Sequence, residues 1–80
     1  MATVYFSSEL QRLTGEVECR VSALDYRSLI DELVSRYENL DKPLLMEMSV
    51  SIDDFILVEP LLETISSDAE VHFFHFVKGG

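Results

Sequence analysis

The sequence predicts a small α+β roll, in which a mixed sheet of four to five strands carries one main helix on one face. Three observations predict this fold. The N-terminal part reads as an antiparallel hairpin, an amphipathic helical stretch follows it, and the chain then returns to strand-like patterns that end at residues 70–76. A hairpin followed by a crossover helix permits the last strand to lie parallel to the first.

The first strand is expected at residues 2–6, which are rich in aromatic and β-branched side chains. Val4 and Phe6 would share one face of this strand. Residues 7–15 are expected to form a connection that ends at Gly15, with two leucines available to pack, Leu10 and Leu13.

The second strand is expected at residues 16–22, where apolar and polar residues alternate. This alternation is typical of a half-buried strand, and its inward positions would be Val17, Cys19 and Val21. Cys19 is the one cysteine of the chain, so no internal disulfide is expected. We interpret it as a small buried apolar residue, because a reactive thiol needs exposure and cationic neighbours.

The main helix is expected to begin after Asp25, a suitable N-cap, and to run to about Leu40. Apolar residues recur there at spacings of three and four, which predicts one apolar stripe packed on the sheet. The stripe consists of Tyr26, Leu29, Ile30, Leu33, Val34, Tyr37 and Leu40. Residues 41–43, Asp-Lys-Pro, are expected to end the helix, since proline cannot continue it.

The second half of the chain is expected to add three strands. Residues 46–52 alternate, with their inward side chains at Met46, Met48, Val50 and Ile52. Asp53 and Asp54 are expected to form a solvated turn rather than a cation site. A short strand at residues 55–58 would follow, and then a helical turn in which Leu61, Leu62 and Ile65 pack under the sheet.

The final strand is expected at residues 70–76, and its alternation separates two faces. Val71 and Phe73 would face the core, whereas His72, Phe74 and Phe76 would face the other way. Since one helix covers only one face of a small sheet, Phe74 and Phe76 are candidate docking residues. The alternative is that loop residues such as Leu10, Leu13 or Leu44 cover them.

Length and charge restrict the function classes. Eighty residues are enough for one domain with a small core, and a net charge of −9 disfavours nucleic acid and favours a partner with a basic surface. No stretch has the length and apolarity of a membrane span or the pattern of a secretory signal. A cytoplasmic protein is therefore expected, with no nucleic-acid or membrane partner.

The usual catalytic patterns are missing from the sequence. It has no glycine-rich phosphate loop and no cysteine pair for zinc, and His72 and His75 would point to opposite faces of a strand. No serine comes with a convincing base and orienting acid. We therefore expect no metal, no bound cofactor and no independent enzymatic activity.

The C-terminus carries the functional signal. A strand-like run leads into Gly79 and Gly80, so a 1–76 domain would present a flexible tail of residues 77–80. Glycine lacks a Cβ and can pass through a narrow tunnel. A carboxylate is a poor acyl donor until ATP adenylates it, and a sulfur or nitrogen nucleophile could then take the acyl group from Gly80. Chance and a linker scar are the alternative explanations for the two glycines.

The sequence resembles the MoaD/ThiS family of ubiquitin-like (β-grasp) sulfur carriers, and its length resembles MoaD. The resemblance rests on stretches that occur in the same order along nearly the whole chain: Val4-Tyr5-Phe6, Leu13-Thr14-Gly15, Asp68-Ala69-Glu70-Val71, Phe73-Phe74 and Gly79-Gly80.

This resemblance implies an E1-like partner that adenylates Gly80 with ATP, and a sulfurtransferase or other sulfur donor that gives a thiocarboxylate. The thiocarboxylate would donate sulfur, in MoaD to molybdopterin within a complex with the larger synthase subunit. Phe74 would be the aromatic contact at the partner interface, while Phe76, Val77, Lys78 and Gly79 would contact the partner's tunnel.

The nucleophile that finally receives the acyl group stays open at the level of sequence. A sulfur carrier for molybdopterin is the leading hypothesis, and thiamine, cysteine or a specialised metabolite would use the same tail. A ubiquitin-like modifier joined through Gly80 to protein lysines shares the activation step. A plain interaction module using Phe74 and Phe76 is the third hypothesis.

Overall fold

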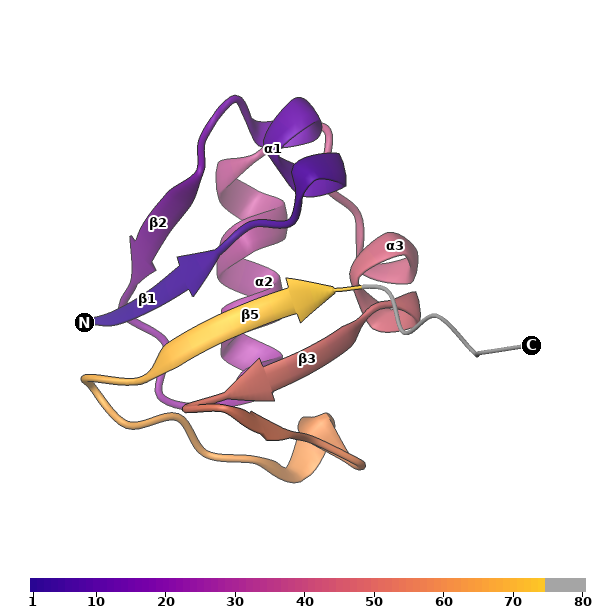
Figure 1. Cartoon of the computed structure of the whole chain (residues 1–80). Helices are drawn as coiled ribbons and strands as arrows, with labels where there is room; N and C mark the ends of the chain where they lie inside the picture. The colour runs from indigo at the N-terminus through magenta and orange to yellow at the C-terminus, as the bar shows by residue number, and fades with distance from the viewer. Residues whose placement is uncertain (75–80) are drawn as a thin grey trace.

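Five strands form one mixed sheet in the order β2-β1-β5-β3-β4 in the computed structural model, which describes residues 1–74 (Figure 1). β1 is antiparallel to β2 and parallel to β5, and β3 is antiparallel to both β5 and β4. The predicted α+β roll, with its last strand parallel to its first, is confirmed. The bounds are β1 Ala2–Tyr5, β2 Glu18–Val21, β3 Ser49–Ile52, β4 Phe55–Ile56 and β5 Glu70–Phe74.

The main helix, α2 (Tyr26–Arg36), begins where the sequence predicts. Its N-cap Asp25 accepts a hydrogen bond of 2.8 Å from the backbone N–H of Ser28, which satisfies one of the free donors of the first turn. The predicted end at Leu40 is wrong. The backbone of Tyr37 is already extended. The chain leaves the helix there because Asp41, four residues later, is the extended N-cap of another helix.

A third helix, α3 (Lys42–Glu47), starts where the sequence predicts only a helix end. The Asp41 side chain accepts from the Leu44 N–H at 2.8 Å, and Pro43 lies in the first turn, where a missing N–H costs nothing. Met46 therefore lies on a helix and is 46% exposed, so its predicted inward strand position is wrong. Met48 and Val50 are buried as predicted, and Ile52 is half-buried.

The connection predicted after the first strand is also a helix, α1 (Ser8–Thr14). Gly15 ends it with a left-handed φ of 77°, and its N–H donates to the Gln11 carbonyl at 2.8 Å. Leu10 is buried, and Leu13 packs against the core. Val17 is 63% exposed, contrary to prediction, because it precedes β2. Cys19 and Val21 are buried, as expected.

The segment between β3 and β5 contains the predicted turn and a short 3-10 helix, η1 (Pro60–Leu62). Asp53 and Asp54 have left-handed φ values of 51° and 72°, which is the backbone of a tight hairpin turn. Ile65 is buried, but Leu62 is 75% exposed and Leu61 is 37% exposed, so the prediction that these leucines pack under the sheet is wrong.

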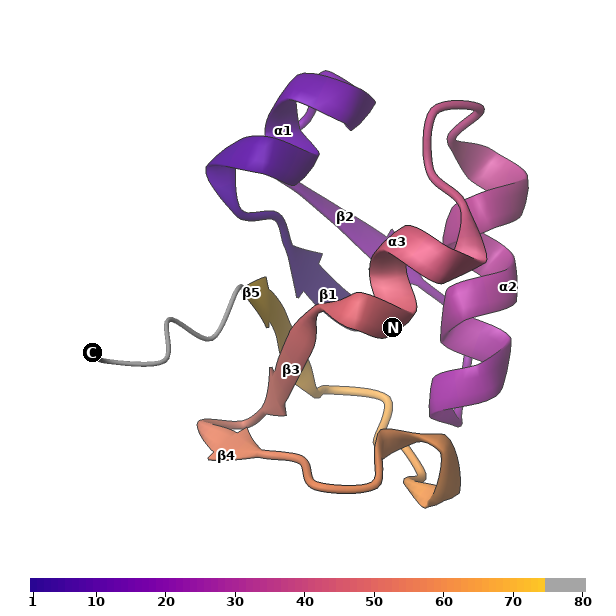
Figure 2. The ribbon, with the colours of Figure 1, turned by 90° about the vertical axis from the view of Figure 1, so that its right-hand side faces the viewer.

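The core lies between the sheet and α2, which covers one face of the sheet (Figures 1 and 2). Its largest fully buried side chains include Tyr26, Leu29 and Leu33 of α2 and Phe73 of β5. On the opposite face of the central strands, the described side chains are half-buried or exposed. Within residues 1–74, no helix has the length and apolarity needed to cross a membrane.

Candidate functional site

The strand that leads toward the C-terminus is held from three directions. β5 is hydrogen-bonded between β1 on one side and β3 on the other. Val71 and Phe73 point into the core with 0% and 2% exposure, as the alternation predicts. The ring of Phe73 lies 6.2 Å from the ring of Tyr26, so α2 packs directly over β5. This arrangement makes β5 a rigid base.

The beginning of β5 is fixed by a reciprocal contact with the hairpin turn. The Asp53 N–H donates to the Glu70 carbonyl, and the Glu70 N–H donates to Asp53 Oδ1, both at 2.9 Å. The acidic pair therefore shapes the turn, as predicted. Among residues 1–74, no group of three histidine, cysteine or acidic side chains is placed to hold a metal ion.

Phe74 is the one predicted site residue that lies within the described part of the chain. It is the last residue of β5, pairs with Ser49 of β3 and lies on the outward face with His72. The sequence leaves two alternatives for Phe74, an exposed docking residue or a residue covered by loops. Its side chain is half-buried, which is intermediate between the two. Phe76, Val77, Lys78, Gly79 and Gly80 lie outside the described residues, so their roles remain predictions.

Strand register places His72 in a row of outward side chains that crosses the sheet. Tyr5 and Ser51 are its partners on β1 and β3, and Ile56 of β4 is the partner of Ser51. The Tyr5 and His72 rings stack at 4.7 Å with an angle of 12° between their planes. We call Tyr5, His72, Ser51 and Ile56 the open-face row. With Phe74, it forms an aromatic and aliphatic surface suited to protein docking.

Sequence reasoning missed three members of this row: Tyr5, Ser51 and Ile56. Their outward direction follows from the period of two in each strand. Their proximity to His72 depends on strand order and register, which the alternation within one strand does not contain. Ile56 is 56% exposed, and a large exposed apolar residue in the same row as a stacked aromatic pair is the kind of feature found at interfaces.

Acidic side chains flank the open-face row. Glu18 is the β2 partner of Tyr5, and Glu70 is the β5 partner of Thr3, and both glutamates are exposed. Together with the net charge of −9, they favour a partner whose docking surface is basic. Such complementarity increases the rate of encounter more than the affinity, and salt would weaken it.

The cysteine lies away from this surface and is protected. Cys19 is 8% exposed, and burial raises the pKa of its thiol above the usual value, although hydrogen bonding to Tyr37 opposes the rise. Burial also raises the pKa of Tyr37 to about 12. A thiol with a raised pKa and little exposure is a poor nucleophile at neutral pH. The interpretation of Cys19 as a buried apolar residue is consistent with these observations.

Comparison with known proteins identifies the fold. The chain is similar to the crystal structure of SAMP1 from Haloferax volcanii, with a TM-score of 0.78 and 18% sequence identity, over 99% of this chain and 98% of that one. The fold is therefore the β-grasp (ubiquitin-like) fold. No family model matches the sequence, and no curated protein matches it.

Proposed function

We propose that this chain is a sulfur carrier whose C-terminal carboxylate, on Gly80, is the reactive group. The observation that carries the proposal is the position of β5. The strand lies in the middle of the sheet and is fixed by Phe73, by the Asp53 turn and by two neighbouring strands, and the sequence after it ends in Gly79-Gly80. A firmly held strand, followed after four residues by two glycines without side chains, suits delivery of a carboxylate into a partner's active site.

The proposed chemistry proceeds in two steps. The Gly80 carboxylate attacks the α-phosphorus of ATP in an E1-like adenylating enzyme, which releases pyrophosphate and forms an acyl adenylate. In the second step, sulfide from a donor displaces AMP and leaves a thiocarboxylate. Where the donor is a sulfurtransferase persulfide, its outer sulfur displaces AMP to give an acyl disulfide, and a thiol reductant then cleaves the S–S bond to release the thiocarboxylate. In this scheme the chain is a protein co-substrate and not an enzyme, and ATP is bound by the activating partner.

The open-face row and Phe74 would dock these partners. Aromatic and aliphatic anchors fit a partner with an apolar pocket, and the net charge of −9 favours a basic rim around that pocket. Phe76, Val77, Lys78 and Gly79 would then lie in the partner's tunnel. On the resemblance to MoaD, the sulfur would be transferred into the dithiolene of molybdopterin within a complex with a large synthase subunit. Thiamine, cysteine or a specialised metabolite are the alternative destinations.

The second candidate is a ubiquitin-like modifier joined through Gly80 to lysines of other proteins. The observation in its favour is the fold similarity to SAMP1, a ubiquitin-like small archaeal modifier protein. Adenylation is common to both candidates, and only the final nucleophile differs: sulfur in one case and a lysine amine in the other.

Intact mass spectrometry separates the two candidates. The full chain would be incubated with its cognate E1-like enzyme, ATP and a sulfur donor, with a chain lacking Gly79-Gly80 as the control. Replacement of one oxygen by sulfur supports the carrier, whereas covalent products of higher mass on other proteins support the modifier. An unchanged mass in every condition would contradict both, and would leave an interaction module that uses the open-face row.

A further inference from the structure

The segment that follows β3 exposes an unusual amount of apolar surface. Five large apolar side chains within residues 55–62 are exposed, at fractions from 37% to 94%: Phe55, Ile56, Val58, Leu61 and Leu62. Single exposed apolar residues are normal on protein surfaces, but a cluster over a few consecutive residues marks a contact surface. Ile56 belongs to the open-face row, whereas Val58, Leu61 and Leu62 line a different feature.

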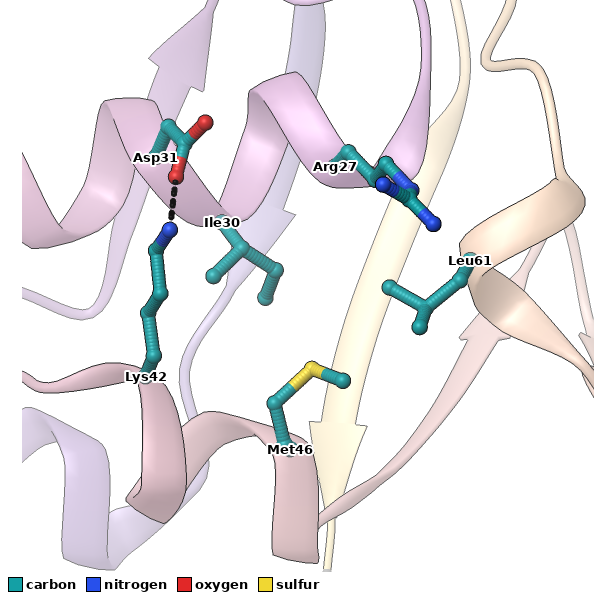
Figure 3. A pocket seen from close by; sticks show the side chains of 6 residues that line it. All are labelled: Arg27, Ile30, Asp31, Lys42, Met46 and Leu61. Atoms are coloured by element: carbon teal, nitrogen blue, oxygen red, sulfur yellow. Dashed lines mark ion pairs between the residues drawn. The ribbon is translucent and has the colours of Figure 1, made fainter.

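That feature is a groove on the helical side of the molecule. A hollow of about 270 Å³ lies between α2, α3 and η1 and is lined by Arg27, Ile30, Asp31, Lys42, Met46 and Leu61 (Figure 3). A second hollow of about 430 Å³ is lined by Arg27, Met46, Val58, Glu59, Pro60, Leu61 and Leu62. Because both hollows share Arg27, Met46 and Leu61, we treat them as one continuous feature, the α2–η1 groove.

The groove has an apolar floor and walls, an ion pair at one end and Arg27 where the two hollows meet. Ile30 is 3% exposed and forms the floor, while the exposed side chains of Met46 from α3 and Leu61 from η1 face it (Figure 3). Lys42 and Asp31 form an ion pair of 2.8 Å at one end, so the lysine charge is already compensated (Figure 3). Arg27 lies toward η1 and forms no ion pair with any residue in the described part of the chain.

These features indicate what kind of occupant fits. Two adjoining apolar hollows accept two large aliphatic side chains. Arg27, which forms no ion pair within residues 1–74, favours a carboxylate on the side of the first hollow, because Glu59 already lines the second. Met46 has a flexible side chain that adapts to different apolar shapes. A second copy of this chain is disfavoured, since each copy carries a net charge of −9. The open form of the groove, with Val58 94% exposed, suits side chains of a protein more than an enclosed small molecule.

We propose that the α2–η1 groove is a docking site for a short segment of a partner protein that presents two aliphatic side chains next to an acidic residue. The residues that line the groove belong to α2, α3 and the segment around η1, and α2 lies on one side of the sheet (Figure 2). Tyr5 and His72 lie on the other face, since Val4, Val71 and Phe73 of the same strands point into the core. A partner bound there leaves the open face accessible, so this chain can contact two proteins at once. The proposal does not depend on the chemistry of Gly80.

The test uses the isotopically labelled full chain and three short amidated peptides. The first peptide carries two leucines one helical turn apart and a glutamate beside them. The second replaces both leucines by serine, and the third replaces the glutamate by lysine. We expect the first peptide to shift the amide resonances of Arg27 and Met46, and those of Val58, Glu59, Leu61 and Leu62, in a saturable manner. Resonances of Tyr5 and His72 should stay in place.

Variants distinguish specific binding in the groove from non-specific hydrophobic binding of the peptides. Val58→Ser, at a fully exposed position, and Leu61→Ser should each weaken binding of the first peptide by about tenfold. Val17→Ser serves as the matched control, because Val17 is 63% exposed but lines neither hollow. Arg27→Glu should weaken the first peptide by about fivefold and restore binding of the lysine peptide, since the charges are exchanged.

Three results would overturn the proposal. The first is the absence of shifts with the leucine peptide at millimolar concentration. The second is equal binding of the serine peptide, which would remove the role of the apolar hollows. The third is shifts confined to the open-face row. None of these results bears on whether Gly80 is adenylated, so failure here is distinguishable from failure of the proposed function.

Discussion

Two separate variants, Phe73→Ala and Phe74→Ala, test which face of β5 points into the core. Phe73 is 2% exposed and contacts the core, so Phe73→Ala removes a fully buried ring and leaves a cavity. Such changes cost about 3–5 kcal/mol. A domain of this length has an unfolding free energy of about 4–12 kcal/mol, from the usual range per residue. Phe73→Ala should therefore remove between a quarter of the stability and all of it.

Phe74→Ala should behave differently, because this side chain is half-buried on the outward face. About half of the burial is lost, so a cost of about 1–2 kcal/mol is expected. If Phe74 is a docking anchor, the same change removes about 2 kcal/mol from partner binding, or about thirtyfold in affinity. The two variants should thus separate stability from partner recognition.

The assay for stability is urea unfolding followed by far-ultraviolet circular dichroism, because the chain has no tryptophan. With an m-value of about 1 kcal/mol per molar urea, the midpoint should fall by about 3–5 M for Phe73→Ala and about 1–2 M for Phe74→Ala. Partner affinity would be measured by titration with the cognate E1-like enzyme. Equal loss of stability in both variants would refute the face assignment, and unchanged affinity in Phe74→Ala would refute the docking role.

Three further predictions concern single residues. Gly15→Ala should cost about 1 kcal/mol, or about 4–8 °C in Tm, because the left-handed φ of 77° is strained for alanine even though its Cβ would meet no neighbour. Gly15→Asn should cost less, because asparagine tolerates the left-handed region better. Equal Tm values for the wild type and both variants would contradict this backbone strain. The hydrogen bond from the Ser28 N–H lowers the pKa of Asp25, so the ionised carboxylate stabilises the fold at pH values above its unfolded pKa. The wild type should therefore lose stability relative to Asp25→Asn as the pH falls from about 5 to about 3. Parallel pH profiles of the two chains in thermal melts would argue against this effect. Cys19 should react with a thiol reagent at least about tenfold more slowly in the native chain than in urea, and similar rates would contradict its burial.

The strand patterns and the start of the main helix could be predicted because their signals are local and strong. Val71 and Phe73 alternate with His72 and Phe74, and burial follows this pattern. The stripe from Tyr26 to Leu33 has a helical period, and Asp25 is a good N-cap. The parallel pairing of β1 and β5 then follows from the general rules of strand connection.

The short helices could not be predicted because their ends depend on tertiary structure. α1 has seven residues and α3 has six, so neither has a long periodic pattern. An aspartate followed two residues later by a proline, as at Asp41 and Pro43, fits the end of one helix as well as the start of the next. Val17 fits the alternation but lies before the first pair of β2, and Met46 fits the alternation of a strand although α3 continues to Glu47.

The candidate site was only partly accessible to sequence reasoning. Phe74 follows from alternation alone, whereas Tyr5 and Ile56 join the site through strand register. The α2–η1 groove was missed because Arg27, Met46 and Leu61 come from three elements that are distant in the sequence. The sequence predicts that Leu61 and Leu62 pack under the sheet, and their exposure depends on where η1 lies in the folded chain.

The most direct test of the central claim is ATP–pyrophosphate exchange catalysed by the cognate E1-like enzyme. The full chain should stimulate the exchange, because formation of the acyl adenylate on Gly80 is reversible. A chain lacking only Gly80 should reduce the exchange to the level of enzyme alone, while its urea midpoint should match the wild type. Undiminished exchange with the truncated chain, or no exchange with the full chain, would contradict the claim.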